Sequence, residues 1–364
     1  TNTAVDEKSN FGMALAIADF NLDSKLDFFV TGMSSTTARR LEYMGLGRKD
    51  MPTLDQMRMK MGYGNRMYIR EGPGKYREPP FNDQVARSGW SWGTVAFDFD
   101  NDGDSDIYIN NGHISGKSAT DYCTKFWRCD LYTGSSNEDR VMAAFYEPNL
   151  EKLGSISWNG YEKNKLFMNQ AGKGFTDVAF LMNSALESDC RNLVVDDFDL
   201  DGRADLLLIE VGQEPDKTMV QTLRLLLNRF PGHNNWIGLR LQEAPGYRAL
   251  GAKVTVAYPG GKETSAFVTG DSFWSQHSLL KHFGLGNADR VDYIEVRWSN
   301  GHVKRIENPR INQYDDILPP TRKDLPSNLG FWLANASVVL AILVALAGLV
   351  FWNRRNRRTD QSQV

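Results

Sequence analysis

A nine-residue acidic pattern that occurs three times places the tightest limit on the fold of this 364-residue chain. Oxygen-bearing side chains stand at its positions 1, 3, 5 and 9, and phenylalanine stands at position 2 each time. The copies run from Asp19 to Asp27, from Asp98 to Asp106 and from Asp197 to Asp205. So many carboxylates in one short loop repel one another unless a cation neutralises them. Because Ca²⁺ is a hard cation that takes about six to eight oxygen ligands, the pattern predicts calcium sites.

The residues on either side of each loop are typical of β-strands. An EF-hand would need flanking helices and a glutamate at position 12, where this chain has Val30, Ile109 and Leu208. Short apolar runs lie directly before and after each loop instead, which predicts three strand–loop–strand units. Glycine at position 6 permits the sharp turn of the second and third loops, whereas Ser24 in the first loop predicts a weaker site.

These units resemble FG-GAP (VCBS-type) repeats, which build β-propellers. The segments Asn65–Tyr76 and Asn164–Ala179 are similar to the connecting strands of that family. The resemblance implies about three structural calcium ions, each locking a hairpin within a blade. The ligands that it implies are Asp19, Asn21, Asp23 and Asp27 in the first loop; Asp98, Asp100, Asp102 and Asp106 in the second; and Asp197, Asp199, Asp201 and Asp205 in the third.

Residues 1–232 are therefore expected to form FG-GAP propeller blades. The loops begin 79 and 99 residues apart, which is longer than one four-stranded blade. This length holds roughly four or five blades, at the low end of the known range of about four to eight. An open propeller exposes strand edges. If the ring is incomplete, the missing blades are expected upstream of this chain or in another chain.

Residues 233–317 predict a second, smaller β domain. The segments Ala249–Val254, His282–Gly286 and Val296–Gly301 resemble the ASPIC/UnbV domain. FG-GAP repeats followed by this domain are the arrangement of the cartilage acidic protein-like family. The resemblance implies an all-β protein in which propeller-type blades precede a β-sandwich-like domain, and it implies no established activity.

The carboxy-terminal segment predicts a membrane anchor. Residues 329–352 contain no charged side chain, and a helix of that length would span about 36 Å, enough to cross a bilayer. Four arginines follow within residues 353–364, which indicates a cytoplasmic tail. A proline-rich tether at 318–328 precedes the span. This interpretation makes the chain a single-pass membrane protein with its bulk in the periplasm or outside the cell; a buried core helix is the alternative.

Three cysteines are present. In an oxidising compartment Cys123 and Cys129 could close a small loop through a disulfide, and the alternative is two unpaired thiols. Cys190 would then be left over. No Cys/His cluster has the spacing of a zinc site.

Composition and motifs favour a binding protein over an enzyme. The net charge of −3 does not suggest a nucleic-acid partner. None of the five histidines stands in an HExxH spacing, and no nucleophile elbow or phosphate-binding loop is present. We therefore expect a membrane-anchored, extracytoplasmic, calcium-binding scaffold for protein–protein binding or adhesion. The first alternative is an accessory subunit that caps a larger integral membrane complex, and the second is a periplasmic enzyme.

Overall fold

A computed structural model describes residues 4–48, 50–133, 152, 155–213 and 219–321. The chain divides into two compact units, residues 1–319 and residues 320–364. Nearly all of the second unit lies outside the described residues, and so do the predicted membrane span at 329–352 and the basic tail after it.

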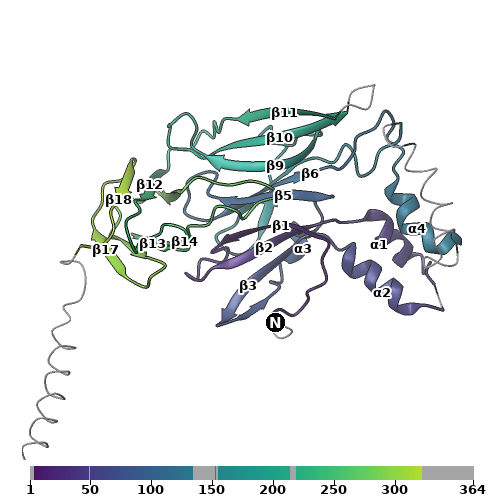
Figure 1. Ribbon diagram of the computed structural model, residues 1–364, viewed down its shortest axis with the longest axis horizontal. Coiled ribbons are helices and arrows are strands. Elements are labelled where there is room, and N and C mark those ends of the chain that lie inside the picture. Colours follow the sequence, from purple (N-terminus) through teal and green to yellow (C-terminus); the bar gives the residue numbers. More distant parts are fainter. Residues whose placement is uncertain (1–3, 49, 134–151, 153–154, 214–218, 322–364) are drawn as a thin grey trace, which may run out of the picture. The chain divides into compact units, whose positions relative to one another are not determined.

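Three antiparallel sheets are built from the first part of the chain (Figure 1). The first sheet has the order β1 (Gly12–Ala18), β2 (Asp27–Gly32), β3 (Arg66–Gly72), β4 (Lys75–Arg77). The second has the order β5 (Ser91–Phe97), β6 (Asp106–Asn111), β7 (Lys165–Asn169), β8 (Phe175–Asp177). The third has the order β9 (Asp189–Asp196), β10 (Asp205–Gln213), β11 (Met219–Leu226). Because strand order follows chain order, each sheet is a simple meander.

The second sheet lies between the other two. Its first strand β5 packs against β1 on one side and against β9 on the other. In β6, Ile107 and Ile109 point into the core shared with the first sheet, whereas Tyr108 points into the core shared with the third. Side chains alternate between the two faces of a strand, so the apolar run from Ile107 to Ile109 suits a sheet that is covered on both sides.

Four helices interrupt this arrangement within the described residues. Helices α1 (Thr36–Tyr43) and α2 (Pro52–Met61) lie between β2 and β3. The short helix α3 (Asn82–Ala86) joins the first sheet to the second, and α4 (Cys123–Thr133) lies between β6 and β7. Ser35 begins α1 by accepting the backbone N–H of Ala38, a standard N-cap.

Helix α4 corrects the predicted disulfide. Cys123 and Cys129 both belong to this helix, which holds them about 9 Å apart along its axis. A disulfide needs Cα atoms within roughly 7 Å, so the helix excludes the bridge. Cys123 is a free, buried cysteine whose sulfur lies 3.7 Å from the hydroxyl of Ser35. Cys190 is also free and buried.

The remaining strands form a sandwich of two sheets. One sheet has the order β15 (Leu280–Gly286), β12 (Asn235–Leu241), β18 (Tyr314–Ile317). The other has the order β14 (Gly261–Ala266), β13 (Lys253–Tyr258), β16 (Tyr293–Arg297), β17 (Val303–Glu307). Phe267, Phe283 and Trp298 are almost wholly inaccessible and centre the core between the two sheets.

The predicted architecture requires two corrections. First, no propeller closes: the described residues form three blade-like sheets, and the chain then continues into the sandwich instead of completing a ring (Figure 1). A ring needs about four blades or more, which explains why three do not close. Second, none of the helices in the described ranges is long and apolar enough to cross a membrane.

Candidate metal centre

The three acidic loops adopt one backbone conformation. Each connects the first two strands of its sheet, so the pairs β1–β2, β5–β6 and β9–β10 are hairpins closed by a loop. Position 6 has a positive φ in every loop, at 64° for Ser24, 97° for Gly103 and 84° for Gly202. This conformation is strained for serine and free of strain for glycine, as the sequence predicts.

Two carboxylates fold each loop. The aspartate at position 1 accepts backbone N–H groups from positions 5 and 6; for Asp98 these bonds are 3.1 and 2.8 Å long. The aspartate at position 9 accepts the N–H of position 2 and a second N–H from a residue in, or just after, the third strand of the sheet. For Asp106 the two donors are Phe99, at 2.8 Å, and Asn169, at 2.8 Å. Both carboxylates are thereby held facing the inside of the loop.

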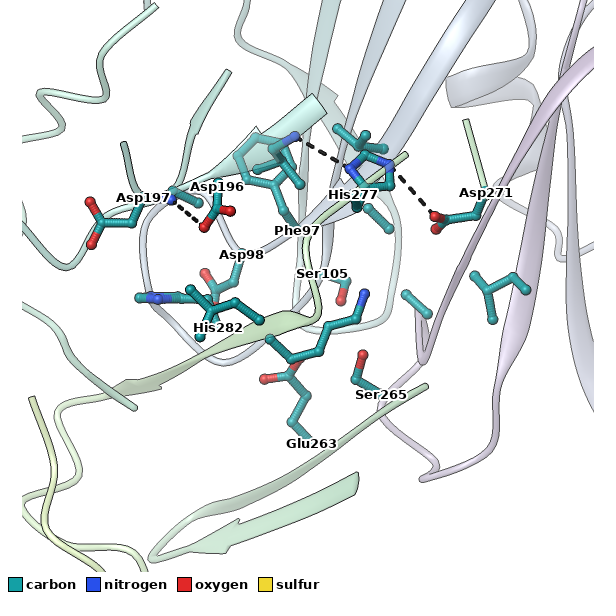
Figure 2. Close-up of a pocket in the computed structure, with 18 of the residues that line it drawn as sticks. Phe97, Asp98, Ser105, Asp196, Asp197, Glu263, Ser265, Asp271, His277 and His282 are labelled. Atoms are coloured by element: carbon teal, nitrogen blue, oxygen red, sulfur yellow. Dashed lines mark hydrogen bonds and ion pairs between the residues drawn. The ribbon is translucent and has the colours of Figure 1, made fainter. Parts of the chain in front are cut away.

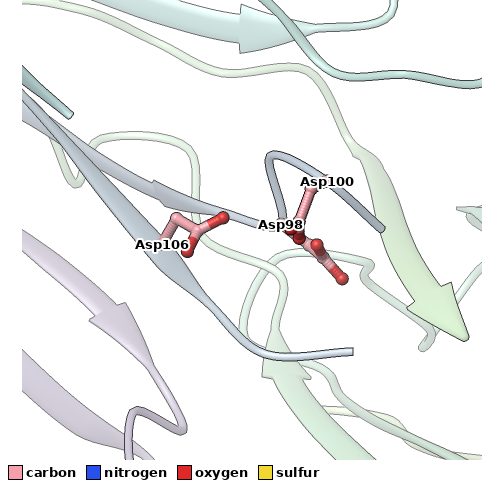
Figure 3. Close-up of side chains that lie close together, drawn as sticks. All are labelled: Asp98, Asp100 and Asp106. Carbon is pink, nitrogen blue, oxygen red and sulfur yellow. The ribbon is translucent and has the colours of Figure 1, made fainter. Parts of the chain in front are cut away.

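The second and third loops each bring three carboxylates together. Asp98, Asp100 and Asp106 place oxygens within 4.8 Å of one another (Figure 3). The corresponding residues of the third loop, at positions 1, 3 and 9, do the same: Asp197, Asp199 and Asp205. A single cation can bridge oxygens at such separations, since calcium–oxygen distances are about 2.3–2.6 Å.

The other predicted ligands are arranged differently. At position 5, Asp23, Asp102 and Asp201 lie outside these two triads, and each accepts the backbone N–H of position 7. The first loop, Asp19 to Asp27, forms no triad of acidic side chains, because position 3 is Asn21.

The three loops differ in the ion pairs that they form with lysine and arginine. In the third loop, Arg229 contacts Asp199 at 2.7 Å and Asp201 at 2.8 Å. In the first loop, Lys25 contacts Asp23 at 2.7 Å. Within the described residues, no ion pair joins a carboxylate of the second loop to a lysine, arginine or histidine. The second loop therefore carries the most uncompensated charge.

Burial makes this charge costly. Desolvation, reinforced by neighbouring carboxylates, raises the pKa of Asp98 and of Asp106 well above the ordinary value. The same causes raise the pKa of Asp100 to about 6 and that of Asp104 to about 7. Without a cation, such a loop must either retain protons or repel itself.

Asp104 is a functional candidate that the sequence analysis missed. It stands at position 7, which is not among the predicted ligand positions 1, 3, 5 and 9. One of its oxygens accepts the N–H of Ala171 at 2.9 Å, and the other is buried without a hydrogen-bond partner among the described residues. An orphaned anionic oxygen beside a carboxylate triad fits a hard divalent cation, so the residues present suit calcium.

The loops also join the sheets to one another and to the sandwich. Asn169 donates its side-chain N–H to Phe20 of the first loop at 3.1 Å, and Asn228 donates to Phe99 of the second at 2.7 Å. From the sandwich, the tyrosyl hydroxyl of Tyr314 donates to Asp197. Asn169 ends β7, Asn228 follows β11 and Tyr314 lies in the sandwich, so the nine-residue pattern did not reveal them.

A small cavity of about 70 Å³, lined by both polar and apolar side chains, lies beside the second and third loops. Figure 2 shows Asp98 and Asp197 of the second and third loops around it, together with Glu263 and His277 from the sandwich segment. His277 lies 3.5 Å from Asp271, and burial lowers the pKa of this histidine. Small-molecule sites occupy roughly 300–1,000 Å³. A space this small suits a few ordered waters rather than a substrate.

Comparison with known proteins adds to this geometry. Residues 243–323 match the family model described as ASPIC and UnbV. This confirms the predicted ASPIC/UnbV segment, which covers well under half of the chain. The match includes most of the sandwich, whose Tyr314 contacts the third loop. The FG-GAP resemblance of the preceding sheets remains a prediction.

Nine-tenths of the chain is similar to proteins named cartilage acidic protein 1. Identity is 23% over 329 residues with the Xenopus tropicalis protein, 22% over 328 with the Homo sapiens protein and 24% over 343 with the Mus musculus protein. The alignments cover 89–90% of this chain and 38–40% of each relative. The chain thus spans about two-fifths of the length of the curated relatives it matches.

The predicted single-pass membrane location does not stand. The described helices include none that could cross a bilayer, and the similarity is to proteins named for cartilage. The predicted span at 329–352 lies outside the described residues.

Proposed function

We propose that this chain is an extracellular scaffold that binds other proteins and is stabilised by calcium. The observation that carries the proposal is the second loop, where three carboxylates converge within 4.8 Å and have no cationic partner in the described part of the chain. A divalent cation there would replace mutual repulsion with shared coordination. Asp98, Asp100 and Asp106 would hold it, with the free oxygen of Asp104 close by in the same loop.

The cation would have a structural role. Bound calcium would supply positive charge that holds the carboxylates of the loop in place. Hydrogen bonds from the same loop would then hold the neighbouring elements in place. Asp106 accepts an N–H from β7, while Asn101 in the same loop donates to Gly202 of the third loop at 2.9 Å and lies 2.7 Å from His282 of the sandwich. One ordered loop therefore fixes the second sheet, the third loop and the sandwich together.

The three loops would bind calcium with unequal affinity. The third loop has a triad, but Arg229 already neutralises part of its charge, so calcium must compete with an arginine. The first loop has the amide of Asn21 at position 3 and the ammonium of Lys25 beside Asp23. Affinity rises with the number of charged ligands, so we rank the second loop first and the first loop last. The FG-GAP resemblance supports all three sites.

An extracellular setting suits such sites. Extracellular calcium modules work with dissociation constants as weak as about 10⁻⁴–10⁻³ M, because free calcium is abundant there. Similarity to cartilage acidic protein 1 supports the same setting and a binding role. The partners that we propose are other proteins.

Thermal unfolding in calcium and in excess EGTA tests this function. Calcium at about 100 times its dissociation constant stabilises the folded state by about 2.7 kcal/mol per site. We expect calcium to raise the melting temperature, and magnesium to raise it less because Mg²⁺ demands a tighter octahedral geometry. Equal melting temperatures in calcium and EGTA would contradict the proposal.

A further inference from the structure

The third sheet lacks a strand that the other two possess. The first and second sheets have four strands, and their outer strands are β4 and β8. The third sheet has three strands within the described residues, because the chain passes from β11 towards β12 of the sandwich (Figure 1). β11 is therefore an edge strand, with backbone donors and acceptors that are free to pair with another strand.

Hydrogen bonds to the acidic loops fix which residues of the three sheets correspond. In each sheet the aspartate at position 9 accepts an N–H from one residue at the end of the third strand. The donors of these bonds are Arg70, Asn169 and Asn228. Four residues before each donor stands a basic residue. These are Arg66 in β3, Lys165 in β7 and Arg224 in β11.

The fourth strands of the two complete sheets neutralise this basic residue. Arg66 forms an ion pair with Glu78, which directly follows β4. Lys165 forms one with Asp177 of β8, with nitrogen and oxygen 2.7 Å apart. Each acidic residue is followed by an apolar one, Pro79 or Val178. A fourth strand in this protein thus brings an acidic residue and then an apolar residue to the same place.

Within the described residues, β11 has no fourth strand beside it, so it has neither the acidic nor the apolar partner residue. Arg224 is half exposed and contacts Glu210 of its neighbouring strand, at 2.7 and 2.8 Å, in place of an acid from a fourth strand. The next residue, Leu225, is 46% exposed, whereas the corresponding Met67 and Leu166 are wholly buried. Leu223, two residues earlier, is 66% exposed. The edge therefore presents apolar side chains around an arginine that could accept a second acid.

A groove of about 530 Å³ begins where β11 ends. Its apolar lining comes from both neighbouring sheets and includes Leu166, Met182, Leu206 and Leu225. In the second sheet, the backbone N–H of Val178 bonds to Leu166 at 2.8 Å, and its side chain is buried in the core. In the third sheet the residue that corresponds to Leu166 is Leu225, which lies beside Leu207 on the face opposite to Leu206 and Leu208, so the apolar residue of an added strand would lie beside Leu225 on that exposed face rather than in the groove.

The aromatic position of the missing strand is already filled. In the second sheet, Phe175 of β8 packs edge-on against Phe20, with ring centroids 6.2 Å apart. In the third sheet, Phe230 packs edge-on against Phe99 at 5.6 Å, although it comes from the segment that leads to the sandwich. An added strand therefore needs to supply only the acidic and the apolar residue.

We propose that the free edge of β11 docks an extended segment of a partner protein in which an acidic residue is followed directly by an apolar residue. The segment adds to the sheet as its fourth, antiparallel strand. Its acid pairs with Arg224, and its apolar side chain packs beside Leu225 on the exposed face of the sheet. This inference names the kind of segment that the proposed scaffold would bind, and it rests on the proposed binding role. It does not depend on calcium binding at the loops.

Peptides copied from the protein's own fourth strand provide the test. The probe is a fluorescein-labelled peptide of residues 170–179, which contains the acid and the apolar residue as Asp177 and Val178. The control peptide carries Asp177→Lys and Val178→Asp. Fluorescence anisotropy with the full 364-residue chain is expected to show at least about tenfold tighter binding of the probe. Equal binding of the two peptides, or binding of neither, overturns the proposal.

A charge exchange separates specific docking from a general loss of structure. Arg224→Glu in the chain should weaken the probe about tenfold, and a peptide with Asp177→Lys alone should then bind better than the probe. Arg305→Glu is the matched control, because Arg305 lies on edge strand β17 and contacts Glu307 at 2.6 Å. It should leave binding unchanged. Failure of the exchange overturns the proposed pairing.

Two further measurements distinguish failure of peptide docking from failure of the proposed calcium role. Thermal unfolding with and without calcium is measured on the same Arg224→Glu protein, so lost calcium stabilisation and lost docking are scored separately. Size-exclusion chromatography reports self-association. A wild-type dimer that Leu225→Asp dissociates would identify a second copy of this chain as the occupant and would overturn a partner segment.

Discussion

Replacing Asp100 with asparagine should change stability in opposite directions with and without calcium. Asp100 stands at position 3 of the second loop, where the first loop has Asn21, so an amide fits this backbone conformation. Asparagine removes one charge from a crowded set of carboxylates. It also removes one charged ligand from the triad.

The magnitude without calcium follows from the pKa of Asp100. Burial, followed by repulsion from Asp102, raises that pKa from 3.8 to about 6. Such a change corresponds to about 3 kcal/mol of cost for the ionised form at pH 7, and solvent screening of a half-buried group reduces it to about 1.5 kcal/mol. Unfolding a unit of 319 residues changes entropy by roughly 0.7 kcal/mol/K. The melting temperature of Asp100→Asn in EGTA should therefore rise by about 2 °C.

The increase in melting temperature that calcium gives should be smaller for Asp100→Asn than for the wild type. A site filled at 100 times its dissociation constant contributes about 2.7 kcal/mol, or about 4 °C for this unit. Loss of a charged ligand is expected to weaken binding about 100-fold, which leaves the site half filled at the same calcium concentration and its contribution below about 1 °C.

Differential scanning calorimetry in EGTA and in calcium measures both effects on one protein. The control is Asp289→Asn, which neutralises an exposed aspartate outside the loops and should change neither value. A variant that melts lower in EGTA, yet gains as much from calcium as the wild type, would refute the reasoning, because Asp100 would then be neither repelled by its neighbours nor a ligand.

Three further changes have defined outcomes. Asn228→Ala removes the side-chain N–H that the buried carbonyl of Phe99 accepts at 2.7 Å, so urea unfolding should show a loss of about 1–3 kcal/mol. Gly202→Ala puts a methyl group 2.2 Å from the indole nitrogen of Trp236 at a φ of 84°, so its melting temperature should fall in calcium and in EGTA alike. Burial raises the pKa of Glu162 from 4.5 to about 7, so the stability gained from its neutral form is complete below about pH 4.5 and lost as pH rises through 7. Glu162→Gln should flatten this dependence in melting curves between pH 4 and 8.

The sequence predicted the acidic loops well because their information is local. A period of two in the side chains and glycine at position 6 determine the turn, and the aspartates at positions 1, 3 and 9 meet in two of the three loops. The aspartates at position 5 accept the backbone N–H of position 7 instead. Hydrogen-bond geometry within the loop determines this arrangement. Asp104 escaped notice because the pattern takes its ligands only from positions 1, 3, 5 and 9, and Asp104 stands at position 7.

Longer-range features could not be predicted from such patterns. Loop spacing suggested more blades, yet within the described residues the long intervals between loops contain helices α1 to α4 and no further sheet. Two cysteines six residues apart suggested a bridge, and a helix separated them. Several partners of the loops lie more than a hundred residues away, such as Tyr314 at Asp197 and Asn169 at Phe20. Only the packing of the sandwich and the three sheets against one another brings them together.

Direct calcium titration of the metal-free chain tests the central claim most closely. Isothermal titration calorimetry should detect at least one calcium ion bound per chain, and the double variant Asp98→Asn, Asp106→Asn should lose the tightest site while keeping the weaker one at the third loop. Absence of calcium binding by the wild-type chain, or an unchanged isotherm for the double variant, would contradict the account.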